Sequence, residues 1–210
     1  MASAGLYRWA GYAGIAGAIL LVVGEWLHPR MLASNPAGWE LAHEILFISI
    51  ILAIPGLFGV YTRQTRETGS LGFMGFVLVF IALMGFSGIV WLEAFVTPAL
   101  AGDAAVTTAF EKLESGEIPS LIGPLLMVSG IAFSLGSLLL GWATARAGVL
   151  SRTAAYVTLV GGFFFGLGPL LFASAPALDK LAATVFGVGF AWLAYGLTTE
   201  RRMMMAAGPA

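Results

Sequence analysis

The amino-acid sequence predicts an all-α integral membrane bundle of six transmembrane helices. Hydrophobic residues make up 59% of the 210 positions and charged residues only 10%, with a mean hydropathy of +0.93. Soluble domains carry about 25% charged residues, so this composition cannot cover a water-facing surface. A helix needs about 20 mainly apolar residues to cross a bilayer. We expect such spans at Leu6–His28, Trp39–Thr62, Ser70–Thr97, Ser120–Ala145, Ala154–Ala175 and Leu181–Thr199.

Four prolines mark expected ends and kinks of these helices. Pro29 should end the first helix, because the residue before a proline avoids the α conformation, and Pro98 lies where the third helix should end. Pro55 and Pro169 fall inside spans, where each removes a backbone hydrogen bond and should kink its helix. The short loops between the spans leave residues 1–210 as a single domain.

The one long connection, at about residues 101–119, is expected to hold a short amphipathic helix on the extracytoplasmic side. Phe110 and Leu113 lie three positions apart, and charged residues surround them: Glu111, Lys112, Glu114 and Glu117. This pattern is typical of a helix that lies on the membrane or caps the bundle. A lid over a site beneath it is the alternative.

The basic residues predict the orientation of the chain. Because cytoplasmic loops carry an excess of lysine and arginine, both termini of this multi-pass cell-membrane protein are expected in the cytoplasm. Seven of the ten basic residues fall on that side of the six spans: Arg8, Arg63, Arg66, Arg146, Arg152, Arg201 and Arg202. The expected partner is the lipid bilayer, and the net charge of −1 gives no reason to expect nucleic acid.

Small residues recur at the spacing that lets helices pack closely in lipid. They form two stripes, Ala10/Gly14/Ala18 in the first span and Gly162/Gly166 in the fifth. We expect both stripes to hold this bundle together. A homo-oligomer or a larger membrane complex is the other arrangement that such stripes would serve.

The sequence excludes several kinds of chemistry. No cysteine is present, which excludes disulfides, thiolate metal sites and a cysteine nucleophile. No G-x-S-x-G, Walker A or H-E-x-x-H motif occurs. With only two histidines a histidine-box oxygenase is excluded, and no lysine lies deep in a span to form a retinal Schiff base.

Ionisable residues gather at the extracytoplasmic ends of the first three spans. Two Glu-x-x-His pairs, E-W-L-H and E-L-A-H, face each other across a short connection, and further glutamates lie at the same level. Three residues advance a helix by about 300°, so the members of each pair should share a face. Such groups are costly within a membrane unless they are paired or coordinated. The cluster comprises Glu25, His28, Glu40, His43, Glu44 and Glu93.

Glutamate and histidine together suit iron, manganese or zinc, which predicts a metal-binding membrane enzyme or metal-handling protein. Glu44 would then stay free as the catalytic carboxylate that moves protons for a metal-bound water. Haem held by the two histidines is disfavoured, because neighbouring helices leave little room for a macrocycle. The expected metal ligands are Glu25, His28, Glu40, His43 and Glu93.

Three other interpretations of the cluster stay open. It could bind protons in a proton- or cation-coupled transporter of a small solute, which would have a path past Glu25 with Pro55 or Pro169 beside it. The chain could be an accessory subunit of a larger membrane complex without chemistry of its own. The charges could also simply lie at the membrane interface, where tryptophans gather: Trp26, Trp39 and Trp91.

Overall fold

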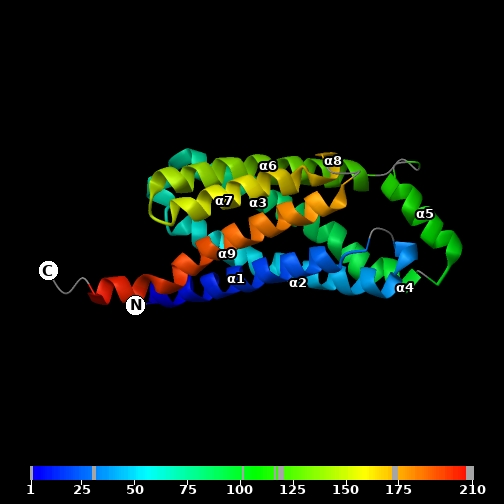
Figure 1. Ribbon diagram of the computed structural model, residues 1–210, viewed down its shortest axis with the longest axis horizontal. Helices are drawn as coiled ribbons and strands as arrows, with labels where there is room; N and C mark the ends of the chain where they lie inside the picture. The colour runs from blue at the N-terminus through cyan, green and yellow to red at the C-terminus, as the bar shows by residue number, and fades with distance from the viewer. Residues whose placement is uncertain are drawn as a thin grey trace.

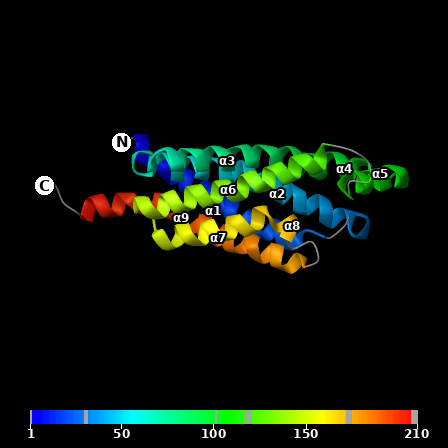
Figure 2. The ribbon, with the colours of Figure 1, turned by 90° about the horizontal axis from the view of Figure 1, so that it is seen from above.

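The computed structural model describes residues 2–29, 32–100, 102–115, 117, 121–171 and 175–206. Within these ranges every regular element is a helix, and the long helices lie side by side along one axis (Figures 1 and 2). The elements are α1 (Ala2–Leu27), η1 (Leu32–Ser34), α2 (Pro36–Thr62), α3 (Thr65–Trp91), η2 (Leu92–Val96), α4 (Thr97–Leu100), α5 (Ala104–Ser115), α6 (Ile122–Ala147), α7 (Arg152–Gly166), α8 (Gly168–Leu171) and α9 (Pro176–Ala206).

Five helical segments are long and apolar enough to cross a membrane: Gly5–Leu27, Pro36–Thr62, Thr65–Leu100, Ile122–Ala147 and Pro176–Thr199. Large apolar side chains on their outer faces are exposed, which suits contact with lipid tails. Examples from four helices are Ile51, Phe73, Val128 and Trp192. The chain is therefore an all-helical protein with the character of a multi-pass membrane protein.

The predicted fifth span, residues 154–175, is divided into α7 and α8. The 15 residues of α7 measure about 22 Å at 1.5 Å per residue, against roughly 30 Å for the hydrocarbon core. The break falls at Leu167, two residues before Pro169. Proline lacks the N–H that would bond to Phe165 and its ring crowds that carbonyl, so the helix cannot continue regularly. A sixth crossing at α7–α8 therefore remains a prediction.

The two ends of the bundle differ in charge. The start of α1, the end of α9, and the α2–α3 and α6–α7 turns lie at one end, which we call the arginine end (Figure 1). Arg63 and Arg66 flank the first of these turns, and Arg146 and Arg152 flank the second. The α1–α2 connection, α5 and α8 lie at the other end, which we call the α5 end (Figure 1). Placement of the arginine end in the cytoplasm remains a prediction of the positive-inside rule.

The prolines act differently at different positions. α1 ends at Leu27, two residues before Pro29, as predicted, whereas α2 continues from Pro36 to Thr62 with Pro55 inside it. Pro98 does not end the third helix: the chain stays helical to Leu100 through the wide turn η2. Insertion of a wide π turn is a known way for a helix to accommodate a disturbance of its regular hydrogen bonds, such as the missing N–H of a proline.

Six helices, the five long ones and α7, form a closed ring. α1 packs on α2, α2 on α3, α3 on α6, α6 on α7, α7 on α9, and α9 returns to α1. Small residues allow the close contacts. A Cβ added to Gly14 would lie 2.9 Å from the Cβ of Ala194 and 3.1 Å from the Cα of Gly56. Gly162 and Gly166 approach α6 in the same way, so both stripes pack helices within the ring.

Replacing Gly14 by leucine should destabilise the ring, because a side chain there meets backbone and Cβ atoms on α2 and α9. Overpacking of a tight contact typically costs about 1–3 kcal/mol. Thermal unfolding in detergent is expected to show a lower melting temperature for Gly14→Leu. The matched control is Gly88→Leu, because no atom lies within 4 Å of a Cβ built at Gly88. Equal melting temperatures for the two variants would disprove this account of the packing.

Candidate functional site

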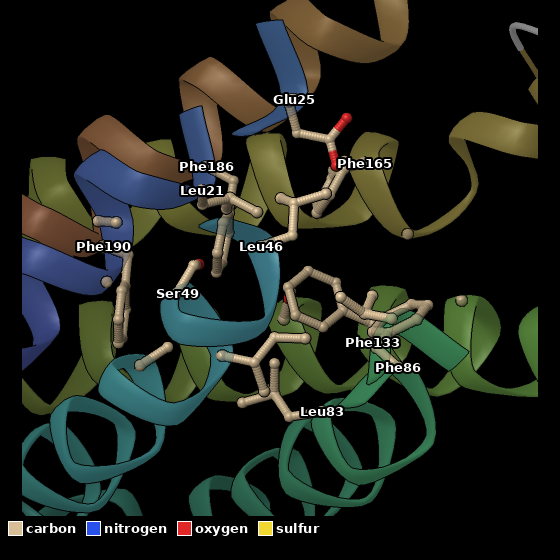
Figure 3. A pocket seen from close by; sticks show the side chains of 18 of the residues that line it. Leu21, Glu25, Leu46, Ser49, Leu83, Phe86, Phe133, Phe165, Phe186 and Phe190 are labelled. Carbon is tan, nitrogen blue, oxygen red and sulfur yellow. The ribbon is translucent and has the colours of Figure 1, made fainter. Parts of the chain in front are cut away.

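A cavity of about 510 Å³ lies inside the ring. All six ring helices line it, and most of its wall is apolar, with leucine and phenylalanine side chains prominent (Figure 3). Ionisable groups line its end nearest α5, namely Glu25, His28, His43, Glu93, Asp179 and Lys180. The lining reaches Thr144 towards the arginine end, where the Thr144 hydroxyl accepts a hydrogen bond of 2.7 Å from the Gln64 amide. The cavity thus has an apolar body and a charged end, which we call the charged end.

Phenylalanine rings from three helices form one connected wall of the cavity. The ring of Phe133 on α6 is 2% exposed and lies edge-on to Phe186 of α9, with centroids 5.0 Å apart. Phe186 stacks on Phe190 at 5.7 Å, and Phe165 of α7 stacks on Phe186 at 6.4 Å. Edge-to-face and offset-stacked pairs hold aromatic rings in fixed orientations. The apolar body of the cavity is therefore a shaped surface.

Three side chains at the charged end form a hydrogen-bonded row. The Nε2 atom of His43 lies 2.7 Å from the Glu93 carboxyl and 3.2 Å from the Nε2 atom of His28. The Nδ1 atom of His43 lies 2.8 Å from the carbonyl oxygen of Trp39, one turn earlier in α2. His43 is only 2% exposed and Glu93 only 9%. The row is therefore held between α1, α2 and η2 and largely shielded from solvent.

The wide turn η2 carries Glu93. Its five residues, Leu92–Val96, form a π-helix, and the backbone N–H and hydroxyl of Thr97 both reach the carbonyl of Leu92. A π turn changes the direction in which the following residues point and is frequent at functional sites. The carboxyl group that contacts His43 thus belongs to a residue of the π turn.

The partners of His43 fix where its protons lie. A carbonyl oxygen can only accept, so Nδ1 must carry a hydrogen for the bond to Trp39. Nε2 then meets the Glu93 carboxyl at 2.7 Å, which is a hydrogen-bond distance only if one of the two groups supplies a proton. Either neutral His43 accepts from a protonated Glu93, or imidazolium donates to carboxylate. The pair therefore holds one proton between them, and His28 lies next in line.

A second group of charges comes from α9. The Nζ atom of Lys180 donates to the carbonyl oxygens of His28 at 3.0 Å and Trp26 at 3.3 Å, and so caps the end of α1. Asp179 and Glu25 line the cavity beside it. One carboxyl oxygen of Asp179 is buried without a hydrogen-bond partner, and the described residues offer Glu25 neither a hydrogen bond nor an ion pair. The charged end therefore contains two carboxyl groups that form no ion pair within the described residues, with the Lys180 ammonium as the nearby positive charge.

The structure brings four of the predicted site residues together and leaves two outside. Glu25, His28, His43 and Glu93 line the cavity, whereas Glu40 is exposed and Glu44 is half-buried away from the lining. A spacing of three residues leaves a rotation of about 60° between side chains, and on α2 this turns Glu40 out of the ring. No three histidine, aspartate or glutamate side chains among the described residues could hold a metal ion. The metal prediction is therefore not supported.

Asp179 and Lys180 are the site residues that sequence reasoning missed. The predicted sixth span began at Leu181, which left both residues in a loop. The helix in fact begins at Pro176, with Asp179 in its first turn. Proline at the first helical position, followed by an acidic residue, is a start signal that could have moved the boundary.

The connection between α4 and α6 contains the predicted amphipathic helix, α5. Val106 and Leu113 of α5 line a separate cavity of about 300 Å³ together with Leu32, Leu92, Leu100 and other apolar residues. The side chain of Phe110 lies outside the described part of the structure. Among the described residues, none of α5 lines the main cavity, so the arrangement fits a cap at the α5 end better than a lid over the charged end.

Comparison with protein families finds no model that matches the chain. Comparisons with curated proteins and with solved structures find no similar protein either. What the chain does is therefore inferred from the arrangement of its own residues.

Elemental analysis distinguishes a proton-holding row from a metal site. Because both His43 nitrogens already have partners, we expect detergent-purified protein to carry no stoichiometric iron, manganese or zinc. The comparison is the His28→Ala/His43→Ala double variant, checked for folding by its melting temperature. About one equivalent of metal in the parent protein, absent from a folded variant, would restore the metal hypothesis.

Acid should weaken the fold through His28. Burial and the neighbouring His43 lower the pKa of His28 from 6.5 to about 4, with Lys180 adding to the effect and Glu93 opposing it. Between these values the unfolded chain binds the proton more readily, so the stability that neutral His28 supplies is lost as pH falls from 6.5 to 4. Melting temperatures measured from pH 7 to pH 4 should fall less steeply for His28→Gln. Parallel slopes for both proteins would show that His28 does not contribute.

Proposed function

We propose that this protein is a membrane transporter that couples the movement of a small, largely apolar solute to protons. The observation that carries the proposal is the cavity of about 510 Å³ whose charged end includes the proton-holding pair His43–Glu93. Pockets for small molecules commonly measure roughly 300–1,000 Å³ and are mainly apolar with a few polar groups. The cavity has both properties.

Coupling requires that solute and proton influence each other's binding free energy. The same cavity wall contains the apolar body and the side chains of His43 and Glu93, so a bound solute would change the surroundings of the shared proton. Buried ionisable residues within membrane helices commonly serve as proton carriers. Because the solute site and the proton-holding pair lie in one cavity, coupling needs no additional structural element to connect them.

Two irregular helices border the cavity where a transporter would need movement. Glu93 lies in the wide turn η2, and α7 breaks at Leu167 just before Pro169, which lines the cavity. Broken helices beside a central site are a recurrent feature of transporters. Pro55, the other proline considered, is exposed and does not line the cavity. This arrangement favours transport over an accessory role without chemistry.

A step in pH tests the proton-holding pair before any solute is known. Liposomes containing the protein are adsorbed on a solid-supported membrane, and the charge that moves after the step is recorded. We expect a transient that Glu93→Gln largely abolishes, because the amide cannot release a proton, and that His43→Gln also reduces. Glu67→Gln removes an exposed carboxylate at the arginine end and should keep the transient. A full transient in folded Glu93→Gln protein would contradict the proposal.

A further inference from the structure

We infer that the solute is a hydrophobic organic cation, a molecule in which a positively charged nitrogen or phosphorus centre is joined to an apolar body that carries rings. The inference rests on the proposed function, because it treats the cavity as the solute site. It is carried by two features that coincide in the cavity: carboxyl groups without an ion-pair partner among the described residues at the charged end, and an aromatic apolar body next to them.

The charged end has an excess of negative groups. The proton shared with His43 neutralises Glu93 and His43 as a pair, because together they carry either no charge or one of each sign. The remaining groups are Glu25, Asp179 and Lys180. The Lys180 ammonium is bound to two carbonyl oxygens at the end of α1 and forms no ion pair within the described residues. The two carboxyl groups of Glu25 and Asp179 therefore outnumber the single ammonium group of Lys180, whose hydrogen bonds go to backbone carbonyls.

An unpaired carboxylate in an apolar cavity is unfavourable unless it takes up a proton or a positive charge approaches it. Glu25 points into the cavity from α1, with Leu21, Leu46 and Phe165 around it (Figure 3). A solute cation beside Glu25 would supply the missing charge. An anionic solute would be repelled by Glu25 and Asp179, and a neutral solute would leave both carboxylates unpaired.

The aromatic lining suits the rest of such a molecule. A cation within about 6 Å of the face of an aromatic ring is attracted to it, most strongly to tryptophan. Trp39 lines the charged end, and Phe133, Phe186 and Phe190 line the apolar body. A ring-bearing body can stack on these rings while its charged centre stays near Glu25. The cavity is thus complementary to a hydrophobic cation, with carboxyl groups where the positive centre would lie and aromatic rings along the apolar body.

The same electrostatics sets the direction of coupling. A cation that enters the charged end makes it harder for His43 and Glu93 to keep their proton, because like charges in a poorly solvated space repel. Binding of the cation and binding of the proton should therefore oppose each other, and the effect must be reciprocal. This relation corresponds to exchange of a cation for a proton.

Tetraphenylphosphonium and tetraphenylborate test the sign of the charge, because both carry four phenyl groups and differ in charge. Saturable binding of each to detergent-purified protein is measured by equilibrium dialysis, with trimethylphenylammonium as a smaller cation that fits if the larger one does not. We expect at least one cation to bind and tetraphenylborate not to compete with it. Equal binding of tetraphenylborate, or no binding of either cation, would overturn the inference.

Glu25→Gln keeps the shape of the side chain and removes its charge. We expect the affinity for the bound cation to fall by about tenfold or more, as the loss of a charged partner in a cavity predicts, whereas Glu67→Gln should bind normally. Retained affinity in folded Glu25→Gln would overturn the assignment of Glu25. In the parent protein the affinity should rise with pH. Glu25, Asp179 and His28 face the same end of the cavity and also bind protons, so Glu93→Gln should weaken this dependence and leave the contribution of the other groups.

The two proposals can fail separately. A charge transient after a pH step without any cation binding would overturn the solute class and leave proton coupling in place. Cation binding that requires Glu25 but does not change with pH would support the solute class and overturn the coupling.

Discussion

Close contact between helix backbones is the constraint on which the rest of the structure depends. In lipid no hydrophobic force drives helices together, so small residues that let backbones approach are the means of association. Gly14 lies against Gly56 of α2 and Ala194 of α9, and Gly162 and Gly166 lie against α6. At these contacts the backbones of neighbouring ring helices lie close together. The larger residues of the ring interior do not fill the space that is left, and the cavity is the result.

Within that frame a single hydrogen bond determines the chemistry available at the charged end. The Trp39 carbonyl holds a proton on Nδ1 of His43, and this leaves Nε2 as the only variable nitrogen of the ring. Glu93, which lies in the wide turn η2, contacts this nitrogen. The π turn thus accompanies two features of the third helix. The chain stays helical through Pro98, and the carboxyl group of Glu93 contacts His43. Local irregularity in the third helix is therefore part of the site.

The sequence was informative about whatever depends on composition and on residues a few positions apart. The apolar stretches placed α1, α2, α3, α6 and α9, and the spacing of apolar and charged residues placed α5. Four residues of the expected Glu/His cluster, Glu25, His28, His43 and Glu93, line the charged end, whereas the role of the cluster stays a prediction. Contacts between segments far apart in the sequence could not be predicted. The outward direction of Glu40, the break at Leu167 and the cavity itself depend on how the helices rotate against one another. No local pattern encodes that rotation.

The Lys180 cap joins the two helices that lie furthest apart in the chain. Its ammonium is bound to carbonyls at the end of α1, and Asp179 beside it belongs to the same first turn of α9. Without α9, the end of α1 lacks its cation, the ring is open between α1 and α7, and the cavity has no wall on that side. Completion of the charged end and closure of the ring therefore depend on the same helix. A chain that stops short of α9 would possess His28, His43 and Glu93 but would lack an enclosed site.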